Sequence, residues 1–332
     1  MHTFEFVRPA DSATAVTTAA QAKTAQQGAD VRFVAGGTTL LDLMKLKVET
    51  PARVIDINRL PLDKIEATPD GGLNIGATVR NSDLAHHPSV ERDYAVLSQA
   101  LLAGASAQLR NMATTAGNLL QRTRCMYFRD TAMPCNKREP GTGCPAITGT
   151  NRMLAILGTS EHCIATNPSD MCVAMAALEA TIHVQGVNGA RAIPFGDFHL
   201  LPGSTPNRET VLEPGDLVTH VTLPPPATGS RQVYLKLRDR ASYEFALASA
   251  AVVITVAGGK VTRARIALGG VGTKPWRSSE AEAALVGQSI DQASLRKAAE
   301  AALRDAKPQS ENGFKIELAK RCLTHALQMA TV

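Results

Sequence analysis

The residues with the clearest chemical potential in this chain are its cysteines. Six of the 332 residues are cysteines, and five of the six fall between positions 125 and 172. A chain of this size does not need disulfides to stabilise its core, and its start, MHTFEFVRPA, lacks the apolar segment of a secretory signal. Clustered cysteines in a reducing compartment instead indicate metal binding or catalysis. The six are Cys125, Cys135, Cys144, Cys163, Cys172 and Cys322.

The spacing of the cysteines narrows the kind of metal centre. Nine residues separate Cys125 from Cys135, eight separate Cys135 from Cys144, and Cys163 follows after eighteen more. The absence of a C-x-x-C pair argues against a zinc ribbon or a thioredoxin site. An irregular segment rich in Pro and Gly can instead fold around a soft metal or an iron–sulfur cluster. The alternative is a set of scattered buried or free thiols.

Basic residues surround these cysteines. Cations at such a place would offset the negative charge of a four-thiolate cluster and raise its reduction potential. The residues in question are Arg122, Arg124, Arg129, Lys137 and Arg138.

Two glycine-containing loops predict an anion site. A strand over 31–35 runs into Gly36-Gly37-Thr38-Thr39 and a helix over 40–46, and a similar polar loop occupies 113–120. Glycine permits close backbone approach, and successive N–H groups at such a turn can surround a phosphate. Two loops of this kind suit a ligand with two phosphates and a ribose. The alternatives are a plain strand-to-helix turn and a helix cap, and neither loop is a G-x-G-x-x-G motif.

A third element is Asn167-Pro168-Ser169-Asp170, which opens a predicted helix over 169–180. An Asp at a helix start is most often a cap. In a nucleotide-binding protein, the same carboxylate can accept a hydrogen bond from a ribose hydroxyl.

The surrounding elements predict two domains. Strands over 4–7, 31–35 and 54–57 alternate with helices over 13–27 and 40–46. An α+β region follows, and the Pro-rich stretch 223–229 reads as a linker. Beyond it the pattern predicts three strands, with a Gly258-Gly259 hairpin between the last two, and then two amphipathic helices. These five elements cover 232–238, 248–257, 260–268, 291–306 and 311–329.

The composition excludes several classes of protein. Hydrophobic residues make up 44% and charged residues 20%, which is ordinary for a globular chain and excludes disorder. A net charge of +5 and 4% aromatic residues argue against nucleic-acid binding. The sequence contains no run of about 18 apolar residues, so it predicts no membrane helix.

The two loops, the Pro168-Ser169-Asp170 element and their order resemble the FAD-binding subunit of the xanthine dehydrogenase and aldehyde oxidoreductase family, the molybdenum hydroxylases. The resemblance covers nearly the whole chain. It implies an α+β fold of the vanillyl-alcohol oxidase (PCMH) type with two subdomains, 1–58 and 59–224, the second carrying an iron–sulfur insertion at 122–164. Residues 230–332 are similar to the α/β C-terminal domain of the carbon monoxide dehydrogenase flavoprotein.

The resemblance also implies the FAD contacts. A lysine matching Lys236 lies near the isoalloxazine carbonyls in the family, where a cation favours the reduced, anionic flavin; without the resemblance, Lys236 is a solvated strand lysine. Pyrophosphate contacts fall on Ala35, Gly36, Gly37, Thr38, Thr39 and Leu40. Adenine-nucleotide and flavin contacts fall on Thr114, Ala116, Gly117 and Asn118, and a ribose contact on Asp170. Phe33, Val34, Arg110 and Val218 complete the predicted cofactor-binding set, and no catalytic residue is expected.

The cysteine segment resembles an insertion found in one subgroup of the family. Periplasmic aldehyde oxidoreductase and 4-hydroxybenzoyl-CoA reductase carry it, with a [4Fe–4S] cluster, and this chain is more similar to the former. The resemblance implies Cys125, Cys135 and Cys144 as ligands, with either Cys163 or Cys172 as the fourth. Cys172 lies in a predicted helix with apolar neighbours, so Cys163 is the expected ligand. Cys172 and Cys322 are expected to be packing residues.

The resemblance therefore implies an electron-transfer subunit of a heterotrimer. Its partners would be a large subunit with the molybdenum cofactor and a small subunit with [2Fe–2S] clusters. Electrons from aldehyde oxidation would enter through the partner's iron–sulfur centre and leave through FAD to an external acceptor. The chain has no signal of its own and would remain cytoplasmic alone. The resemblance implies a periplasmic complex exported in folded form on a partner's twin-arginine signal.

Two other functions remain open from the residues. A stand-alone flavin oxidoreductase would need a base near the flavin, and His86, His87, His162 and His183 are available. The second of these functions is a nucleotide-binding scaffold whose cysteine loop holds zinc. A flavin subunit of a complex like 4-hydroxybenzoyl-CoA reductase is a further variant of the expected function.

Overall fold

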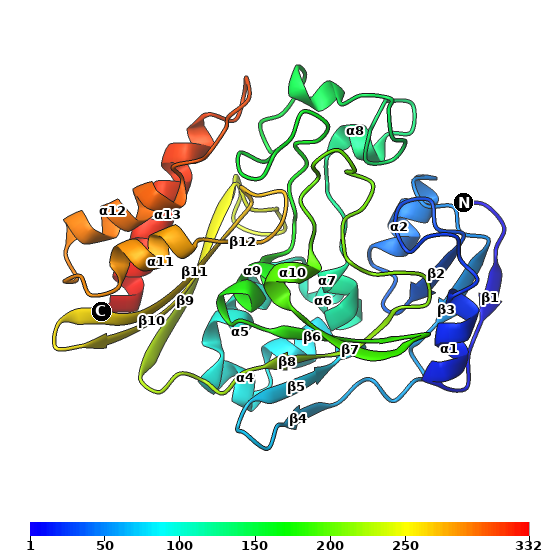
Figure 1. Ribbon diagram of the computed structural model, residues 1–332, viewed down its shortest axis with the longest axis horizontal. Helices are drawn as coiled ribbons and strands as arrows, with labels where there is room; N and C mark the ends of the chain where they lie inside the picture. Colours follow the sequence, from blue (N-terminus) through cyan, green and yellow to red (C-terminus); the bar gives the residue numbers. More distant parts are fainter. Residues whose placement is uncertain (332) are drawn as a thin grey trace.

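The first sheet of the computed structural model, which describes residues 1–331, is a small parallel one. Its strand order is β1-β3-β2, and both neighbouring pairs are parallel. Two helices connect the strands in the predicted β-α-β-α-β order (Figure 1). The elements are β1 (Glu5–Val7), α1 (Ser12–Ala19), β2 (Val31–Val34), α2 (Leu40–Lys45) and β3 (Arg53–Asp56).

The first helix is shorter than predicted, so the prediction of a helix to Gln27 was wrong. The Thr17 and Thr18 hydroxyls donate to carbonyls one turn back, which competes with the helical backbone bonds. Further on, Gln26 Nε2 donates to Leu212 O at 2.7 Å, so its side chain is engaged with a distant loop. The segment 20–30 therefore forms turns that line a cavity instead of continuing the helix.

The second sheet is antiparallel, with the order β4-β5-β8-β6-β7. Its strands are β4 (Ile65–Ala67), β5 (Leu73–Gly76), β6 (Thr181–Gly186), β7 (Gly189–Pro194) and β8 (Leu217–Leu223). Helices share one apolar core with it, because Leu84, Leu97 and Met175 pack in the same cluster as Ile75 and Ile182. These helices are α3 (Asn81–Ala85), α4 (Pro88–Asp93), α5 (Ala95–Ala103) and α9 (Asp170–Ala177).

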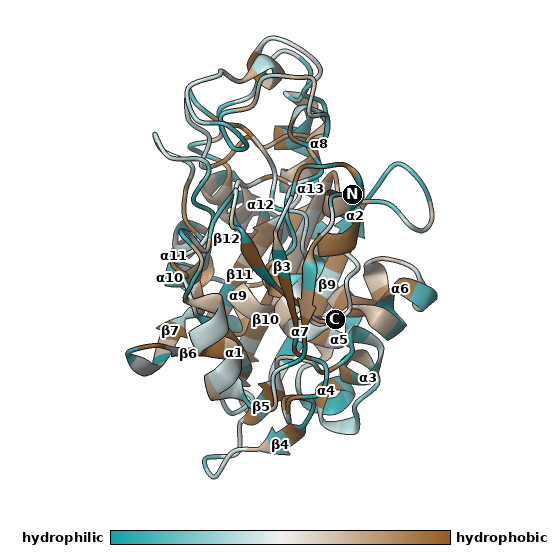
Figure 2. Ribbon diagram, turned by 90° about the vertical axis from the view of Figure 1, so that its right-hand side faces the viewer, coloured by the Kyte–Doolittle hydropathy of each residue, from teal (hydrophilic) through white to brown (hydrophobic). Residues whose placement is uncertain are grey.

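Short helices occupy the segments between these elements. Ser106 and Thr114 cap two of them through their hydroxyl oxygens. The short helices are α6 (Ala107–Met112), α7 (Thr115–Leu119), α8 (Met126–Arg129), the 3-10 turn η1 (Pro145–Ile147) and α10 (Phe195–Phe198). Around α8 the insertion projects from the body, and Figure 2 shows its loops largely in polar colours at the top of the view.

The third sheet, at the C-terminal end, is antiparallel with the order β12-β11-β10-β9. The predicted Gly258-Gly259 hairpin is present, with φ of +57° and +73°. One face of the sheet packs on helix α13 and the other shares the core around α9 (Figure 1). The elements are β9 (Ser230–Leu237), β10 (Ala248–Ala257), β11 (Lys260–Gly269), β12 (Trp276–Arg277), α11 (Ser279–Leu285), α12 (Gln292–Ala302) and α13 (Phe314–Thr331). Within residues 1–331, no helix combines the length and apolarity needed to cross a bilayer.

Candidate cofactor site

The largest part of the predicted cofactor-binding set surrounds one cavity between the first two sheets. The strand β2 and the loop after it form one wall, and the start of α7 forms another. A third wall comes from the loop between α10 and β8, which contributes His199, Glu209 and Thr210. The predicted residues that line the cavity are Phe33, Val34, Ala35, Gly36, Gly37, Thr38, Thr39, Leu40, Thr114 and Gly117.

Glycine is required at the loop after β2. A Cβ placed on Gly36 would lie 1.9 Å from Met112 O, which no backbone can accommodate without moving. Gly37 has a φ of +73°, in the left-handed region that side chains disfavour. The loop therefore needs Gly36 to approach the backbone at the end of α6, and it needs Gly37 to turn.

The two loops are tied together by residues that the sequence pattern did not single out. Arg80 donates to Met112 O at 2.6 Å and to Asn58 Oδ1 at 3.1 Å, and Asn58 Nδ2 donates to Ala35 O at 3.0 Å. Thr114 accepts from Gly117 N at 3.3 Å, so it is the helix cap that the alternative interpretation proposed. Capping and cavity lining coincide at this residue.

Four predicted residues lie behind the cavity instead of lining it. Arg110 donates to Gly104 O at 2.8 Å, and Asn118 Nδ2 donates to Asn81 Oδ1 at 2.8 Å. Ala116 and Val218 are buried in the core.

Asp170 and Lys236 are brought together beside a second cavity. Lys236 Nζ lies 2.8 Å from Asp170 Oδ2, and both side chains are almost buried, so Lys236 is not a solvated strand lysine. Tyr234 Oη donates to Asp170 Oδ1 at 2.5 Å, and burial together with that carboxylate raises the pKa of Tyr234 well above its usual value. Ser169, not Asp170, caps α9 by accepting from Cys172 N at 3.0 Å. The carboxylate is thus free of the capping role.

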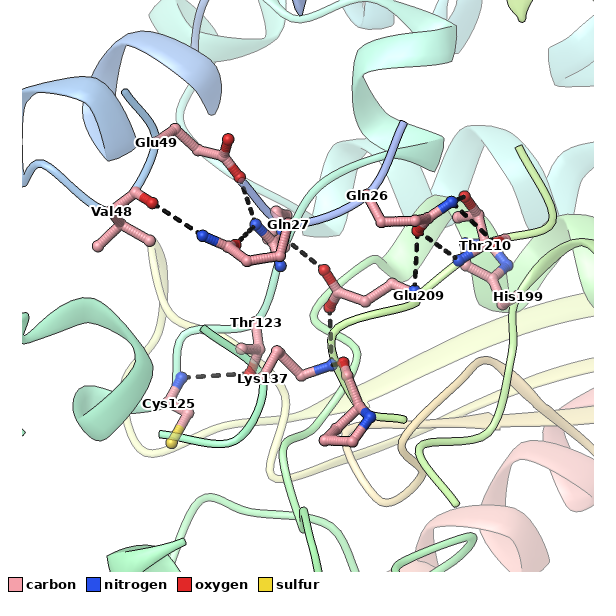
Figure 3. A network of polar contacts seen from close by, with 12 residues as sticks. Gln26, Gln27, Val48, Glu49, Thr123, Cys125, Lys137, His199, Glu209 and Thr210 are labelled. Atoms are coloured by element: carbon pink, nitrogen blue, oxygen red, sulfur yellow. Dashed lines mark hydrogen bonds and ion pairs between the residues drawn. The ribbon is translucent and has the colours of Figure 1, made fainter. Parts of the chain in front are cut away.

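A buried ion network forms one wall of the main cavity. Arg32 pairs with Glu49 at 3.0 Å, Arg122 pairs with both Glu49 and Glu209, and Lys137 Nζ lies 3.0 Å from Glu209 Oε1. Figure 3 shows Glu49, Lys137 and Glu209 converging here from separate segments of the chain. Burial alone would raise the pKa of Glu209, but Arg122 and Lys137 outweigh it and lower the pKa to about 2. Sequence reasoning missed both glutamates, because their partners are distant in the chain.

Most of the basic residues near the cysteines form ion pairs. We expected five basic residues around the thiols to offset the charge of a cluster, and four of these five pair with carboxylates. Arg122 and Lys137 are paired with glutamates, while Arg124 and Arg129 are both paired with Asp42. Arg138 instead donates to the carbonyls of Tyr127 and Phe128 at 2.9 Å.

Four cysteines line one small cavity in the insertion. Cys125, Cys135, Cys144 and Cys163 surround it together with Phe128 and other apolar residues, and these four are the cysteine cage below. Burial raises the pKa of Cys125 to about 12, and it also raises the pKa values of Cys144 and Cys163. Backbone N–H groups oppose that shift, and one of them, Ala165 N, lies 3.5 Å from Cys163 Sγ. Such donors favour thiolate sulfur.

The other two cysteines lie elsewhere. Cys172 is buried in the core around α9, and Cys322 is buried in the C-terminal core. Among residues 1–331, no three His, Cys, Asp or Glu side chains converge closely enough to bind a single metal ion. A four-iron cluster distributes its thiolates over separate irons, so its ligands do not need to meet at one point.

Residues 2–226 match the family described as the FAD binding domain in molybdopterin dehydrogenase. The chain belongs to this family. Residues 233–330 match the carbon monoxide dehydrogenase flavoprotein C-terminal domain. The predicted family and fold class are thereby confirmed, and FAD is confirmed as the cofactor of the matching domain.

Similar proteins and solved structures agree with this family. The chain is 54% identical over 315 residues, 95% of this chain and 96% of the other, to the aldehyde oxidoreductase FAD-binding subunit PaoB of Escherichia coli (strain K12). It is 27% identical to the carbon monoxide dehydrogenase medium chain of Hydrogenophaga pseudoflava, over 92% of this chain and 91% of that one. A solved structure of reconstituted CO dehydrogenase from Oligotropha carboxidovorans superimposes with a TM-score of 0.78 at 26% identity, covering 99% and 98% of the two chains.

The cavity fits the family's cofactor on its own geometry. Arg122 Nη2 is buried without a partner among residues 1–331, and Arg122 lines the cavity beside the glycine loop. A buried, unpaired guanidinium nitrogen is costly unless an acceptor fills the cavity. The anionic pyrophosphate of FAD supplies acceptors of that kind.

Proposed function

We propose that this chain is the FAD-binding, electron-transferring subunit of a molybdenum-containing aldehyde oxidoreductase. The observation that carries the proposal is the 54% identity, over almost the full length of both chains, to a protein named as an aldehyde oxidoreductase FAD-binding subunit. The partners would be a large subunit with the molybdenum cofactor and a small subunit with [2Fe–2S] clusters. The large subunit would oxidise the aldehyde, and the complex would work in the periplasm.

The main cavity would hold the FAD pyrophosphate between its two loops. The backbone from Ala35 to Thr39 and the Thr114 to Gly117 turn provide N–H groups, and Arg122 provides charge. Bound FAD supplies an acceptor for two electrons and a donor to the next carrier. The Asp170–Lys236 pair lies at the second cavity, which shares Thr166, Asn167 and Pro168 with the first. We assign the flavin ring to that side, where Lys236 would stabilise negative charge on the reduced ring.

The cysteine cage would hold a [4Fe–4S] cluster. Four buried thiols around one cavity, apolar walls and backbone donors aimed at sulfur match what such a cluster requires. Without a metal, burial keeps Cys125, Cys144 and Cys163 protonated, because it raises the pKa values of these three thiols. Soft iron would stabilise the thiolate forms instead.

The alternative of a stand-alone flavin oxidoreductase has none of its four expected histidines at the cavity. The residues lining it include none of His86, His87, His162 and His183. His183 stacks on His220 with ring centroids 4.1 Å apart, on the second sheet. The cavity histidine is His199, whose pKa burial lowers to about 4. No observation favours this function over the first.

The test is purification of the full chain together with the subunits that bind it. A bound flavin, about four iron per chain and aldehyde turnover only in the presence of the partners would support the proposal. Zinc in place of iron in the purified chain would contradict the proposed cluster. A chain that turns over an aldehyde alone would contradict the subunit role.

A further inference from the structure

Lys137 occupies the wall between the two proposed cofactor sites. Its side chain lines the main cavity and also the cysteine cage, and Cys163 is the cage residue that does the same. Lys137 follows Cys135 by two positions, so the cage loop itself carries the ammonium group.

Glu209 holds the ammonium group in this place. Lys137 Nζ donates to Glu209 Oε1 at 3.0 Å and to Pro206 O at 2.9 Å, both from the loop between α10 and β8. The Lys137 side chain is only 9% exposed, so its charge has little contact with water and is poorly screened. A buried ammonium group needs such acceptors to satisfy its N–H donors.

The arginines near the cage have acceptors of their own, and Arg138 donates to backbone carbonyls. Arg122 lies between two carboxylates and packs on the Phe128 ring, with its guanidinium carbon 4.6 Å from the ring centre. Arg124 and Arg129 share Asp42. In the ion network, Arg32, Arg122 and Lys137 face Glu49 and Glu209, which leaves one positive charge in excess.

We propose that Lys137 is the residue through which this chain raises the reduction potential of the cage cluster, and that Glu209 is its positioning residue. The inference rests on the cluster proposed above. One-electron reduction adds a negative charge to a centre that already carries four thiolates. A nearby buried cation therefore stabilises the reduced form more than the oxidised form. The electron would come from the partner's iron–sulfur centre.

Substitutions of Lys137 and Glu209 should shift the midpoint potential of the cluster in opposite directions. Lys137→Met removes the cation and keeps the length of the side chain, so the midpoint potential should fall. Glu209→Gln keeps an oxygen that accepts from Lys137 but removes the charge that offsets it, so the potential should rise. In the double variant the two shifts should largely cancel. A purely structural role for the pair would move both single variants in the same direction or would lose the cluster.

The measurement is a reductive titration of the full chain, produced with its partner subunits, followed by the EPR signal of the reduced cluster. Glu317→Gln, which breaks an exposed pair with Arg321 on α13, is the matched control and should keep the wild-type potential. Opposite shifts of the two variants support the proposal, and unshifted or parallel potentials overturn it. If Lys137→Met does not fold, the midpoint potential of Glu209→Gln is the deciding measurement, and it should lie above that of wild type. Wild-type chain without iron would instead contradict the cluster itself.

Discussion

The main cavity and the cysteine cage, as proposed binding sites, offer opposite means of holding a cofactor. The cavity loops consist of backbone and small side chains. Gly36 allows two loops to approach each other closely, and Thr114 caps the turn in the second loop. The cage uses side-chain sulfur, and its backbone serves mainly to bring four thiols together and donate to them. The first kind of site depends on packing between distant segments, whereas the second depends on residue identity. Changes at the two sites should therefore separate flavin content from iron content.

The largest expected effect is the loss of the cluster on removal of one cage ligand. Cys163→Ser should abolish stoichiometric iron, because serine is a poor ligand for iron in a cluster. Metal analysis of the purified chain measures it, with flavin content as the internal reference. Cys172→Ala is the control, since Cys172 is buried in the core around α9, and it should keep its iron. Loss of iron in Cys172→Ala with retention in Cys163→Ser would exchange the two assignments.

The next effect should appear on the flavin side. Gly36→Ala would place a Cβ 1.9 Å from Met112 O and so push the two loops apart. We expect FAD affinity to fall by about tenfold or more, while iron content is kept. Flavin released on denaturation, compared with the iron of the same sample, measures the ratio. Gly196→Ala meets no atom within 4 Å and is the control. Full flavin content in Gly36→Ala would argue that the loops do not need this approach.

The pair at the second cavity should affect stability as well as cofactor binding. Asp170→Asn removes the carboxylate from a buried pair with Lys236 and leaves the ammonium uncompensated. Breaking such a pair typically costs about 3–5 kcal/mol. Tyr234→Phe removes one donor to the same carboxylate and should cost less, about 1–3 kcal/mol. Urea unfolding of the chain checks the order of the two variants. Equal stability of Asp170→Asn and wild type would show that the pair contributes nothing net.

The same contrast explains how much could be predicted from the sequence. The Gly258-Gly259 hairpin and the strand ending before it follow local rules, and both were predicted at the right residues. The cluster of five cysteines over 125–172 also stands out by residue type alone. Glu49 and Glu209 could not be predicted, because an isolated glutamate becomes a buried partner only when a distant Arg122 reaches it. The helix over 13–27 failed for a related reason, since Gln26 bonds to a loop that lies far along the chain.

The smallest expected effect is the acid dependence of the wall that the two sites share. Glu209 has a pKa near 2 in the folded chain against an ordinary 4.5. Its carboxylate therefore contributes stability above pH 4.5 that is lost as the pH falls toward 2. Between about pH 5 and about pH 3.5, wild type should lose roughly 1 kcal/mol more than Glu209→Gln, which has no proton to take up.

Unfolding curves measured at both pH values test this difference. Glu213→Gln removes a charge four positions away, in an exposed pair with Arg208, and should follow wild type because such pairs contribute little. If Glu209→Gln and wild type lose stability in parallel, the carboxylate is not held by Arg122 and Lys137. The wall between the cavity and the cage would then owe its stability to packing. If the curves diverge as expected, its stability depends on the same charges that position Lys137.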